Sequence, residues 1–253
     1  MSILNISLYH FQPLQELSSW KERFMKLCEE GGLKGTVLLA PEGMNAFVAG
    51  EPDGVERFER SIQEWFKKPD LFGKRSWSDT IPYRRLFVKV KKEILTFGVD
   101  SVRPEIQRAP AIAPKDLAQW IREGRDFGLL DTRNDFEFEV GSFEQAVHLN
   151  LRKFNEFPQK IDLLPEDWKE KPVVMFCTGG IRCEKAGIFL EQKGFKNILQ
   201  LDGGILKYFE ECGGEGYRGA CFVFDQRRAV DPSLKVAELP PEVRLMPRVD
   251  PGT

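Results

Sequence analysis

The chain has 253 residues, enough for two domains of modest size that each bury a hydrophobic core. Hydrophobic residues make up 42% of the chain and charged residues 30%, a composition typical of globular proteins. The net charge of −2 argues against a uniformly basic protein that binds nucleic acid or membranes through its overall charge, so any such site requires a local cluster of cations.

The N-terminal segment and the cysteines indicate the compartment. Residues 1–7 carry no basic cluster, and no apolar run approaches the length needed to span a membrane, so neither a signal peptide nor a membrane partner is expected. The five cysteines are an odd number at irregular spacing: Cys28, Cys177, Cys183, Cys212 and Cys221. We therefore expect a cytoplasmic protein with free thiols.

The first part of the chain alternates between strand and helix patterns. Helical spacing of apolar residues predicts helices at 14–30 and 55–66. Runs rich in β-forming residues predict strands at 3–11, 36–40, 45–49 and 86–90. This βαββαβ order predicts an α+β, ferredoxin-like domain over residues 1–98.

The second part has a different pattern. Residues 99–114 contain three prolines and little periodicity, which predicts a linker. A domain over 115–212 then alternates helices at 115–123, 184–193 and 205–211 with strands at 128–131, 146–149, 173–176 and 198–201. This order predicts an α/β domain with a mainly parallel sheet and a ligand site at the carboxyl ends of its strands. Residues 213–253 are expected to form an irregular extension, with one more strand at 221–225.

A cysteine-containing loop stands at one such strand end. Residues 177–183 read Cys-Thr-Gly-Gly-Ile-Arg-Cys and lie between the apolar run 173–176 and a predicted helix. Backbone N–H groups of a glycine-rich loop and the positive end of a helix lower the pKa of a thiol. We expect Cys177 and Arg182 to be catalytic, in an active-site loop completed by Thr178, Gly179, Gly180, Ile181 and Cys183. The alternative is a buried cysteine that precedes an ordinary turn.

The C-terminal half resembles a rhodanese domain. Asp131-Thr132-Arg133, followed by Glu137, Gly141 and the segment 146–150, resembles the entry motif of that family. Cys177 occupies the position of its catalytic cysteine. The usual Gly-His-Ile is replaced by Gly-Ser-Phe at 141–143, a departure that several rhodanese subfamilies share.

The match narrows to one subfamily, the rhodanese-type tRNA uridine hydroxylases. Residues 177–185 resemble the hallmark sequence of this subfamily and read Cys-Thr-Gly-Gly-Ile-Arg-Cys-Glu-Lys. Further matching segments lie at 40–45, 131–134, 154–158, 203–208 and 221–225. The resemblance implies an N-terminal acylphosphatase-like domain, a rhodanese domain, and oxygen-dependent conversion of the wobble uridine (U34) to 5-hydroxyuridine.

Three reactions could use the Cys177 thiolate. Persulfide sulfur transfer is the main alternative to hydroxylation. Cysteine phosphatases place five residues between cysteine and arginine, whereas Cys177 and Arg182 have four between them, so phosphate ester cleavage is not favoured. In the hydroxylation hypothesis the thiolate adds to C6 of uracil and makes C5 reactive towards oxygen. A non-enzymatic binding module would not need an intact cysteine loop.

The residues available for a cofactor are few. The two histidines, His10 and His148, fall in different predicted domains, and non-haem iron typically uses two histidines and a carboxylate. No Gly-x-Gly-x-x-Gly fingerprint is present. Cys212 and Cys221 are too isolated for a zinc site. We therefore expect no bound metal or other cofactor, and molecular oxygen as co-substrate.

Three residues, the last of the loop and the two that follow it, have open roles. Cys183 could resolve an oxidised Cys177 or could simply fill space under the loop. Glu184 and Lys185 belong to the hallmark, but they could equally serve the start and the exposed face of the helix.

A basic stretch supplies a candidate tRNA site. Residues 67–92 contain nine lysines and arginines against two aspartates, with aromatic residues interleaved. Cations contact phosphates and exposed aromatic rings stack on unpaired bases, so an interaction with the tRNA anticodon region is expected. The candidate residues in this stretch are Arg84, Arg85, Lys89 and Lys91. The alternative is a solvated edge strand. Arg152 and Lys153, just after a predicted strand, could reach the same ligand near Cys177 or could be a structural surface pair. The sequence predicts no oligomeric state.

Overall fold

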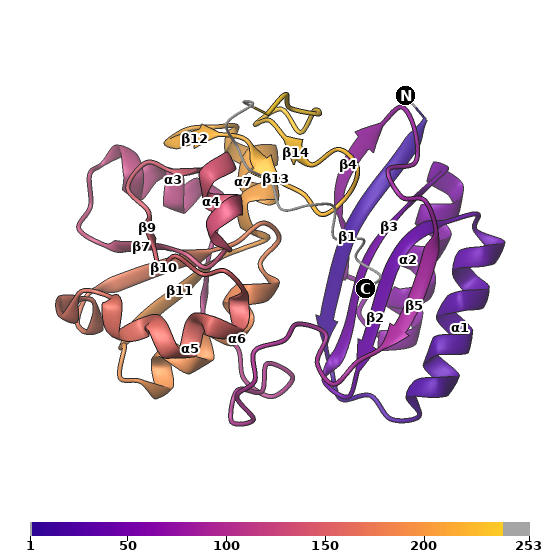
Figure 1. The fold of residues 1–253 in the computed structure, drawn as a ribbon, viewed down its shortest axis with the longest axis horizontal. Helices are drawn as coiled ribbons and strands as arrows, with labels where there is room; N and C mark the ends of the chain where they lie inside the picture. The colour runs from indigo at the N-terminus through magenta and orange to yellow at the C-terminus, as the bar shows by residue number, and fades with distance from the viewer. Residues whose placement is uncertain (1, 240–253) are drawn as a thin grey trace. The chain divides into compact units, whose positions relative to one another are not determined.

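The computed structural model describes residues 2–239 and divides them into two compact units (Figure 1). The N-terminal unit contains residues 2–94 and 224–227, and the C-terminal unit contains residues 95–223 and 228–239. Residues 240–253, part of the predicted irregular extension, lie outside the described residues.

The N-terminal unit is a five-stranded sheet with two helices on one face (Figure 1). The strand order is β4-β1-β3-β2-β5, and only the β2–β5 pair is parallel. The strands are β1 (Ile3–Phe11), β2 (Lys34–Ala40), β3 (Gly43–Gly50), β4 (Lys74–Ser78) and β5 (Leu86–Val90), and the helices are α1 (Leu17–Glu30) and α2 (Pro52–Phe66).

Strand alternation explains which face the helices cover. Leu4, Ile6 and Leu8 of β1 are buried in one hydrophobic core with Phe24 of α1 and Phe58 of α2. Because successive side chains of a strand point to opposite faces, the residues between them lie on the face without helices. The expected ferredoxin-like, acylphosphatase-like architecture is therefore present.

One strand of this unit was not predicted. The strand predicted at 86–90 is present as β5, but β4 (Lys74–Ser78) precedes it as a further strand and pairs with β1, while β5 lies at the other edge. The sequence analysis missed β4 because it reads Lys-Arg-Ser-Trp-Ser and only Ser78 is buried. Backbone pairing with β1 and an ion pair between Arg75 and Glu59 of α2 hold it instead, and neither leaves a hydrophobic period in the sequence.

The C-terminal unit is built around a five-stranded parallel sheet with helices on both faces. The strand order is β6-β11-β10-β7-β9, and every pair is parallel. The strands are β6 (Ala111–Ile112), β7 (Gly128–Asp131), β9 (Val147–His148), β10 (Pro172–Phe176) and β11 (Asn197–Leu201). The helices are α3 (Pro114–Arg122), α4 (Asp135–Val140), α5 (Phe157–Lys160), α6 (Ile181–Gln192) and α7 (Gly204–Cys212).

The sequence of the central strand β10 is a continuous apolar run because the strand is buried on both faces of the sheet. Val173 and Met175 join the core that contains Ile188 of α6, whereas Val174 and Phe176 join the core that contains Tyr208 of α7. A strand buried on both faces needs apolar residues at every position.

Residues 95–112 belong to the C-terminal unit, although part of them reads as a linker in the sequence. Phe97, Val102 and Ala109 are buried in its core, and β6 pairs with β11. Prolines suppress regular periodicity here, so burial in an irregular segment leaves no pattern that periodicity can detect.

Short elements complete the C-terminal unit. Two small antiparallel sheets pair β8 (Gly141–Phe143) with β12 (Tyr217–Gly219) and β13 (Cys221–Phe222) with β14 (Ala229–Val230). The strand expected at 221–225 is thus shorter than predicted. Three 3-10 helices are η1 (Phe154–Glu156), η2 (Ile161–Leu163) and η3 (Glu166–Lys169). In residues 2–239 every helix is too short or too polar to cross a membrane.

Candidate active site

Cys177 lies directly after β10, at the carboxyl end of the parallel sheet. The loop that follows it leads into α6, which begins at Ile181 with Gly180 as its N-cap, so Arg182 and Cys183 both lie in the first helical turn. Gly180 has a φ of 98°, a left-handed conformation that glycine adopts without strain. Thr178 and Gly179 are half-buried, and the other loop residues are buried.

The Cys177 sulfur is surrounded by hydrogen-bond donors. The Gly180 N–H donates to Sγ at 3.1 Å, and the backbone N–H of Arg182 and the thiol of Cys183 also donate to it. Burial by itself raises the pKa of Cys177, but these donors and the positive charge of Arg182 outweigh it and lower the pKa to about 6. At neutral pH the residue is therefore mainly a thiolate.

Cys183 is the proton-bearing partner of this pair. Burial, and then the neighbouring Cys177, raise the pKa of Cys183 well above its ordinary value. Thr132 donates its hydroxyl proton to the Phe176 carbonyl at 2.9 Å and lies 3.7 Å from the Cys183 sulfur. The Cys183 thiol thus remains protonated and available to donate to Cys177. Burial raises the pKa of Cys28 and Cys221 to about 12, so low pKa is not a general property of the buried cysteines here.

The Arg182 guanidinium is held by Glu137, a residue of the entry motif to which the sequence analysis assigned no role. Its Nη1 and Nη2 donate to the two oxygens of Glu137 at 2.7 and 2.8 Å, and both side chains are buried. Glu137 also accepts from the Asn134 N–H at 3.1 Å, as part of a capping box at the start of α4. The entry motif marks Glu137 in the sequence, and the Asn-x-x-Glu spacing predicts its place at the start of a helix.

The N-terminus of α7 supports the loop from the other side. The N–H groups of Ile205 and Leu206 donate to the carbonyls of Cys177 and Thr178 at 3.0 and 3.1 Å. Gly204 has a φ of 66°, and a Cβ at this position would lie 2.5 Å from the Cys177 carbonyl oxygen. The close approach of these two segments therefore requires glycine, a role that the sequence analysis did not assign.

A fully buried ion pair anchors the end of β7 beside the loop. The Arg133 guanidinium donates to Asp131 through Nε at 2.9 Å and Nη2 at 2.6 Å, and to the Gly141 carbonyl at 2.6 Å. Ser142 donates to the same aspartate at 2.8 Å. The Asp-Thr-Arg motif therefore has well-defined structural partners in the folded domain.

The two charged residues of the hallmark also have structural partners. Glu184 pairs with Arg108 and accepts from Gln200 at 3.2 Å, and the Lys185 amino group donates to the Leu95 carbonyl at 2.7 Å. Both side chains are buried at the base of α6. These contacts fasten residues 95–108 to α6.

The structure does not bring the two histidines together. His148 hydrogen-bonds to the Arg133 carbonyl at 3.1 Å and stacks on Phe138, while His10 contacts Gln12 at 3.2 Å in the N-terminal unit. Among the described residues, no group of three or more His, Cys, Asp or Glu side chains is arranged to hold a metal ion.

The candidate tRNA-binding residues fall in two places. Arg84, Arg85 and Lys91 are exposed and Lys89 is half-buried in the N-terminal unit, around β5. Arg152 and Lys153 are exposed in the C-terminal unit, just before η1.

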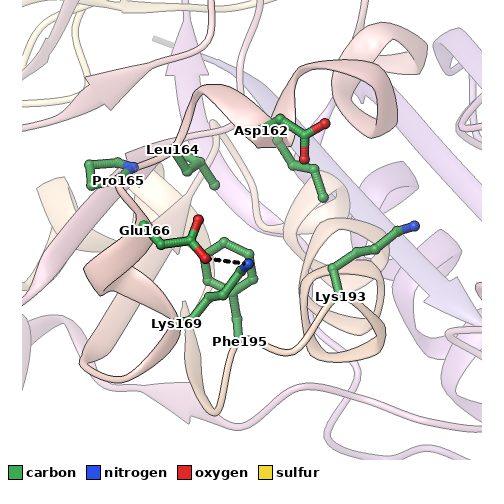
Figure 2. Close-up of a pocket in the computed structure, with 8 residues that line it drawn as sticks. Asp162, Leu164, Pro165, Glu166, Lys169, Lys193 and Phe195 are labelled. Atoms are coloured by element: carbon green, nitrogen blue, oxygen red, sulfur yellow. Dashed lines mark hydrogen bonds and ion pairs between the residues drawn. The ribbon is translucent and has the colours of Figure 1, made fainter.

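A cavity of about 280 Å³ lies away from Cys177 (Figure 2). Its lining includes Lys169 and Phe195, which precede the amino ends of β10 and β11, whereas Cys177 follows the carboxyl end of β10. The remaining lining residues are Ile161, Asp162, Leu164, Pro165, Glu166 and Lys193. The cavity therefore lies at the amino ends of the strands, opposite the end where Cys177 lies, and is not part of the cysteine site.

The Cys183 hydrogen bond can be tested directly. In a Cys183→Ala variant we expect the pKa of Cys177 to rise by roughly one to two pH units, because a hydrogen bond to a charged group contributes about 1.5–3 kcal/mol. Cys183→Ser, which retains a donor, should raise it less. The pH dependence of thiolate ultraviolet absorbance, measured as a difference from Cys177→Ser, gives the value. An unchanged pKa in Cys183→Ala would contradict this role.

The contact between α7 and the loop offers a matched pair of variants. Gly203 and Gly204 both have left-handed φ, but the atoms nearest to a Cβ on Gly203 belong to the Lys207 side chain and not to the backbone of the loop. Each alanine should cost about 1–2 kcal/mol of unfolding free energy through backbone strain. We expect Gly204→Ala alone to displace the loop as well and to raise the pKa of Cys177. Thermal melts and thiolate titration of both variants check this, and equal titration curves would refute it.

Comparison with known proteins identifies both halves of the chain. Residues 3–94 match the family described as UPF0176 acylphosphatase like domain, and residues 113–211 match the Rhodanese-like domain. A protein from Cupriavidus taiwanensis named tRNA uridine(34) hydroxylase is 47% identical over 94% of this chain and 86% of its own length. One of the same name from Variovorax paradoxus is 46% identical over 92% of this chain and 90% of its own. The chain therefore belongs to the tRNA uridine(34) hydroxylase family.

Proposed function

We propose that this protein is an oxidoreductase that hydroxylates C5 of uridine 34 in tRNA in an oxygen-dependent reaction. The observation that carries the proposal is the Cys177 thiolate, whose pKa is lowered to about 6 by the loop donors and Arg182. A nucleophile of this kind is needed to activate C5 of a pyrimidine by addition to C6. The family membership of the chain supports uridine 34 as the target.

The proposed reaction begins with attack by Cys177. Its sulfur forms a bond to C6, and the electron pair of the C5–C6 double bond moves to C5 and the O4 oxygen as an enolate. C5 reacts with molecular oxygen, and protonation gives a C5 hydroperoxide. A two-electron donor of the thiol or nicotinamide class reduces the O–O bond and releases water. Loss of the C5 proton expels the Cys177 thiolate and restores the double bond.

The neighbouring groups have distinct roles in this scheme. Arg182 and the loop N–H groups stabilise the thiolate both before attack and when it leaves again. Glu137 positions Arg182 through the bidentate ion pair. Because Cys177 is only 1% exposed, the side chains that cover it have to move before uracil reaches the sulfur. We expect no resident metal or organic cofactor, and a cytoplasmic location where tRNA is available.

Sulfur transfer is the second candidate function. The Rhodanese-like domain and its short cysteine loop favour it, because a ring of N–H donors also stabilises a cysteine persulfide. In that reaction Cys177 accepts a sulfane sulfur from a donor such as thiosulfate and passes it to a thiol. It requires no RNA, which separates the two functions experimentally.

The decisive test is the modification state of tRNA in cells that lack this protein. We expect nucleoside mass spectrometry to show loss of 5-hydroxyuridine and its derivatives, restored by the wild-type protein and not by Cys177→Ala. Growth under oxygen-18 should place the label at C5. Cys212→Ala is the matched control, since Cys212 is partly exposed and distant from the loop in sequence, and it should restore the modification.

Two results would overturn the hydroxylase proposal. One is full restoration by Cys177→Ala. The other is an unchanged wobble uridine in cells without this protein or a second enzyme for the modification. The latter, with a Cys177 persulfide detected on the purified protein, would favour sulfur transfer.

The basic residues around β5 are proposed to contact tRNA phosphates. Replacing Arg84, Arg85, Lys89 and Lys91 together by glutamine should weaken tRNA binding and make its dependence on salt shallower, because each lost phosphate contact reduces counterion release. Fluorescence anisotropy at several salt concentrations measures both effects. Lys26→Gln with Arg60→Gln, which removes exposed cations from α1 and α2, is the control and should bind as the wild type does. Equal losses in both variants would show only a nonspecific charge effect.

A further inference from the structure

The face of the N-terminal sheet without helices carries aromatic rings from three of its strands. Tyr9 of β1, Phe47 of β3 and Phe87 of β5 are half-buried, while their strand neighbours Leu8, Val48 and Val88 are buried in the core beneath α1 and α2. Alternation therefore places these three rings on the face of the sheet opposite α1 and α2, the helices that Figure 1 shows on one face of it. None of the three was singled out as a site residue, and only Phe87 lies in the basic stretch.

The strand register brings these rings close together. Thr36 of β2 pairs with Phe47 on one side and with Phe87 on the other, so a single row crosses three strands. Tyr9 pairs with Asn45, two residues from Phe47, which makes Tyr9 and Phe47 diagonal neighbours about 7–8 Å apart. Tyr9, Phe47 and Phe87, with Thr36 between the last two, define one region of this side of the sheet, which we call the aromatic face.

All the charged side chains in the strands of this sheet are basic. The five strands contain no aspartate or glutamate, although the chain has 39 acidic residues. Lys74 on β4 lies 4.6 Å from the centre of the Tyr9 ring, and Lys89 on β5 lies 5.0 Å from that of Phe87. Both edges of the aromatic face therefore carry a cation, which suits a ligand that combines flat rings with negative charge.

Two buried polar atoms on the same face have no hydrogen-bond partner among the described residues. They are the Thr36 hydroxyl, between Phe47 and Phe87, and the Asn5 side-chain oxygen. Thr36 is 3% exposed and Asn5 is 2% exposed. Unsatisfied buried polar groups are uncommon, and a ligand that offers donors and acceptors at ring edges would satisfy them.

Residues 224–227 also reach this face. Arg227 donates to Ser76 of β4 at 2.7 Å, and its charge is matched by Asp225 through paired hydrogen bonds. Asp225 therefore adds no net negative charge beside β4, and the positive character of the face comes from its lysines.

We propose that the aromatic face binds unpaired nucleotides of the substrate RNA. Bases stack on Tyr9, Phe47 and Phe87, Lys74 and Lys89 contact phosphates, and Thr36 hydrogen-bonds to a base edge or ribose hydroxyl. Stacking of unpaired bases on aromatic residues of an open β-sheet is a general mode of single-stranded RNA recognition. The proposal rests on the proposed function for the identity of the RNA, which we take to be the anticodon loop of tRNA.

The test uses the full-length protein and a fluorescein-labelled anticodon stem–loop RNA that contains U34. We expect Phe47→Leu and Phe87→Leu each to raise the dissociation constant at least about fivefold, because a base–aromatic stack is worth ~1–3 kcal/mol and leucine retains the apolar volume. Thiolate titration of Cys177 should be unchanged in both variants, which shows that the C-terminal unit is intact.

Trp77→Leu is the matched control. Trp77 is an exposed aromatic residue of β4, 45% exposed, but it pairs with the core residue Leu4 and so lies on the opposite face of the same sheet. It should bind the RNA as the wild type does. Wild-type affinity of Phe47→Leu and Phe87→Leu would overturn the proposal, as would an equal loss in Trp77→Leu or a wild-type protein that does not bind the stem–loop.

The hydroxylation assay separates this proposal from the proposed function. If Phe47→Leu and Phe87→Leu raise KM for the stem–loop while Cys177→Ala abolishes turnover, both proposals are supported. If turnover requires Cys177 but these two variants leave KM unchanged, the RNA-binding proposal is wrong and the hydroxylase proposal is supported. If the stem–loop binds through the aromatic face but its U34 is never modified, the hydroxylase proposal is wrong and the RNA-binding proposal is supported.

Discussion

A negative charge on a sulfur that is 99% buried is the constraint on which this site depends. Burial alone would keep Cys177 protonated, so the thiolate exists only because several donors and a cation converge on it. Each donor has a structural requirement. The Gly180 N–H needs a left-handed residue at the start of α6, and the Cys183 thiol needs a place in the first helical turn. The arrangement of β10, the loop and α6 places all of these donors around the Cys177 thiolate.

The cation that compensates the thiolate is itself buried and must also be compensated. Glu137 does this through two parallel hydrogen bonds to Arg182, and the capping box of α4 orients the glutamate. The N–H groups at the start of α7 then hold the loop carbonyls, which leaves the loop N–H groups directed at the sulfur. Charges of opposite sign thus alternate from Cys177 to Arg182 to Glu137, and three helices contribute to one reactive atom.

Much of this could be predicted from the sequence because the signals are local. The Cys177 loop, the βαββαβ order of the first unit and the continuous apolar run of β10 follow from residues adjacent in the chain, and the structure confirms the α+β and α/β architectures. Prediction failed where local signals were missing. The polar strand β4 has no hydrophobic period, and the proline-containing residues 99–110 place Val102 and Ala109 in the core without forming a helix or strand. The basic stretch was visible, but the strand alternation that defines the aromatic face needed the correct sheet order.

The sequence by itself determined the reactive cysteine, its loop and the family, because glycine spacing and a strand-to-helix junction are properties of one short segment. Only the tertiary structure decided which groups surround that cysteine and therefore how far the pKa of its thiol is lowered. Glu137 lies 45 positions from Arg182, and Thr132 lies 51 positions from Cys183, yet hydrogen bonds join each pair. Tyr9, Phe47 and Phe87 likewise become neighbours only through strand pairing. Hydrogen bonds and stacking act over a few ångströms in space, so their partners are set by the fold and not by distance along the chain.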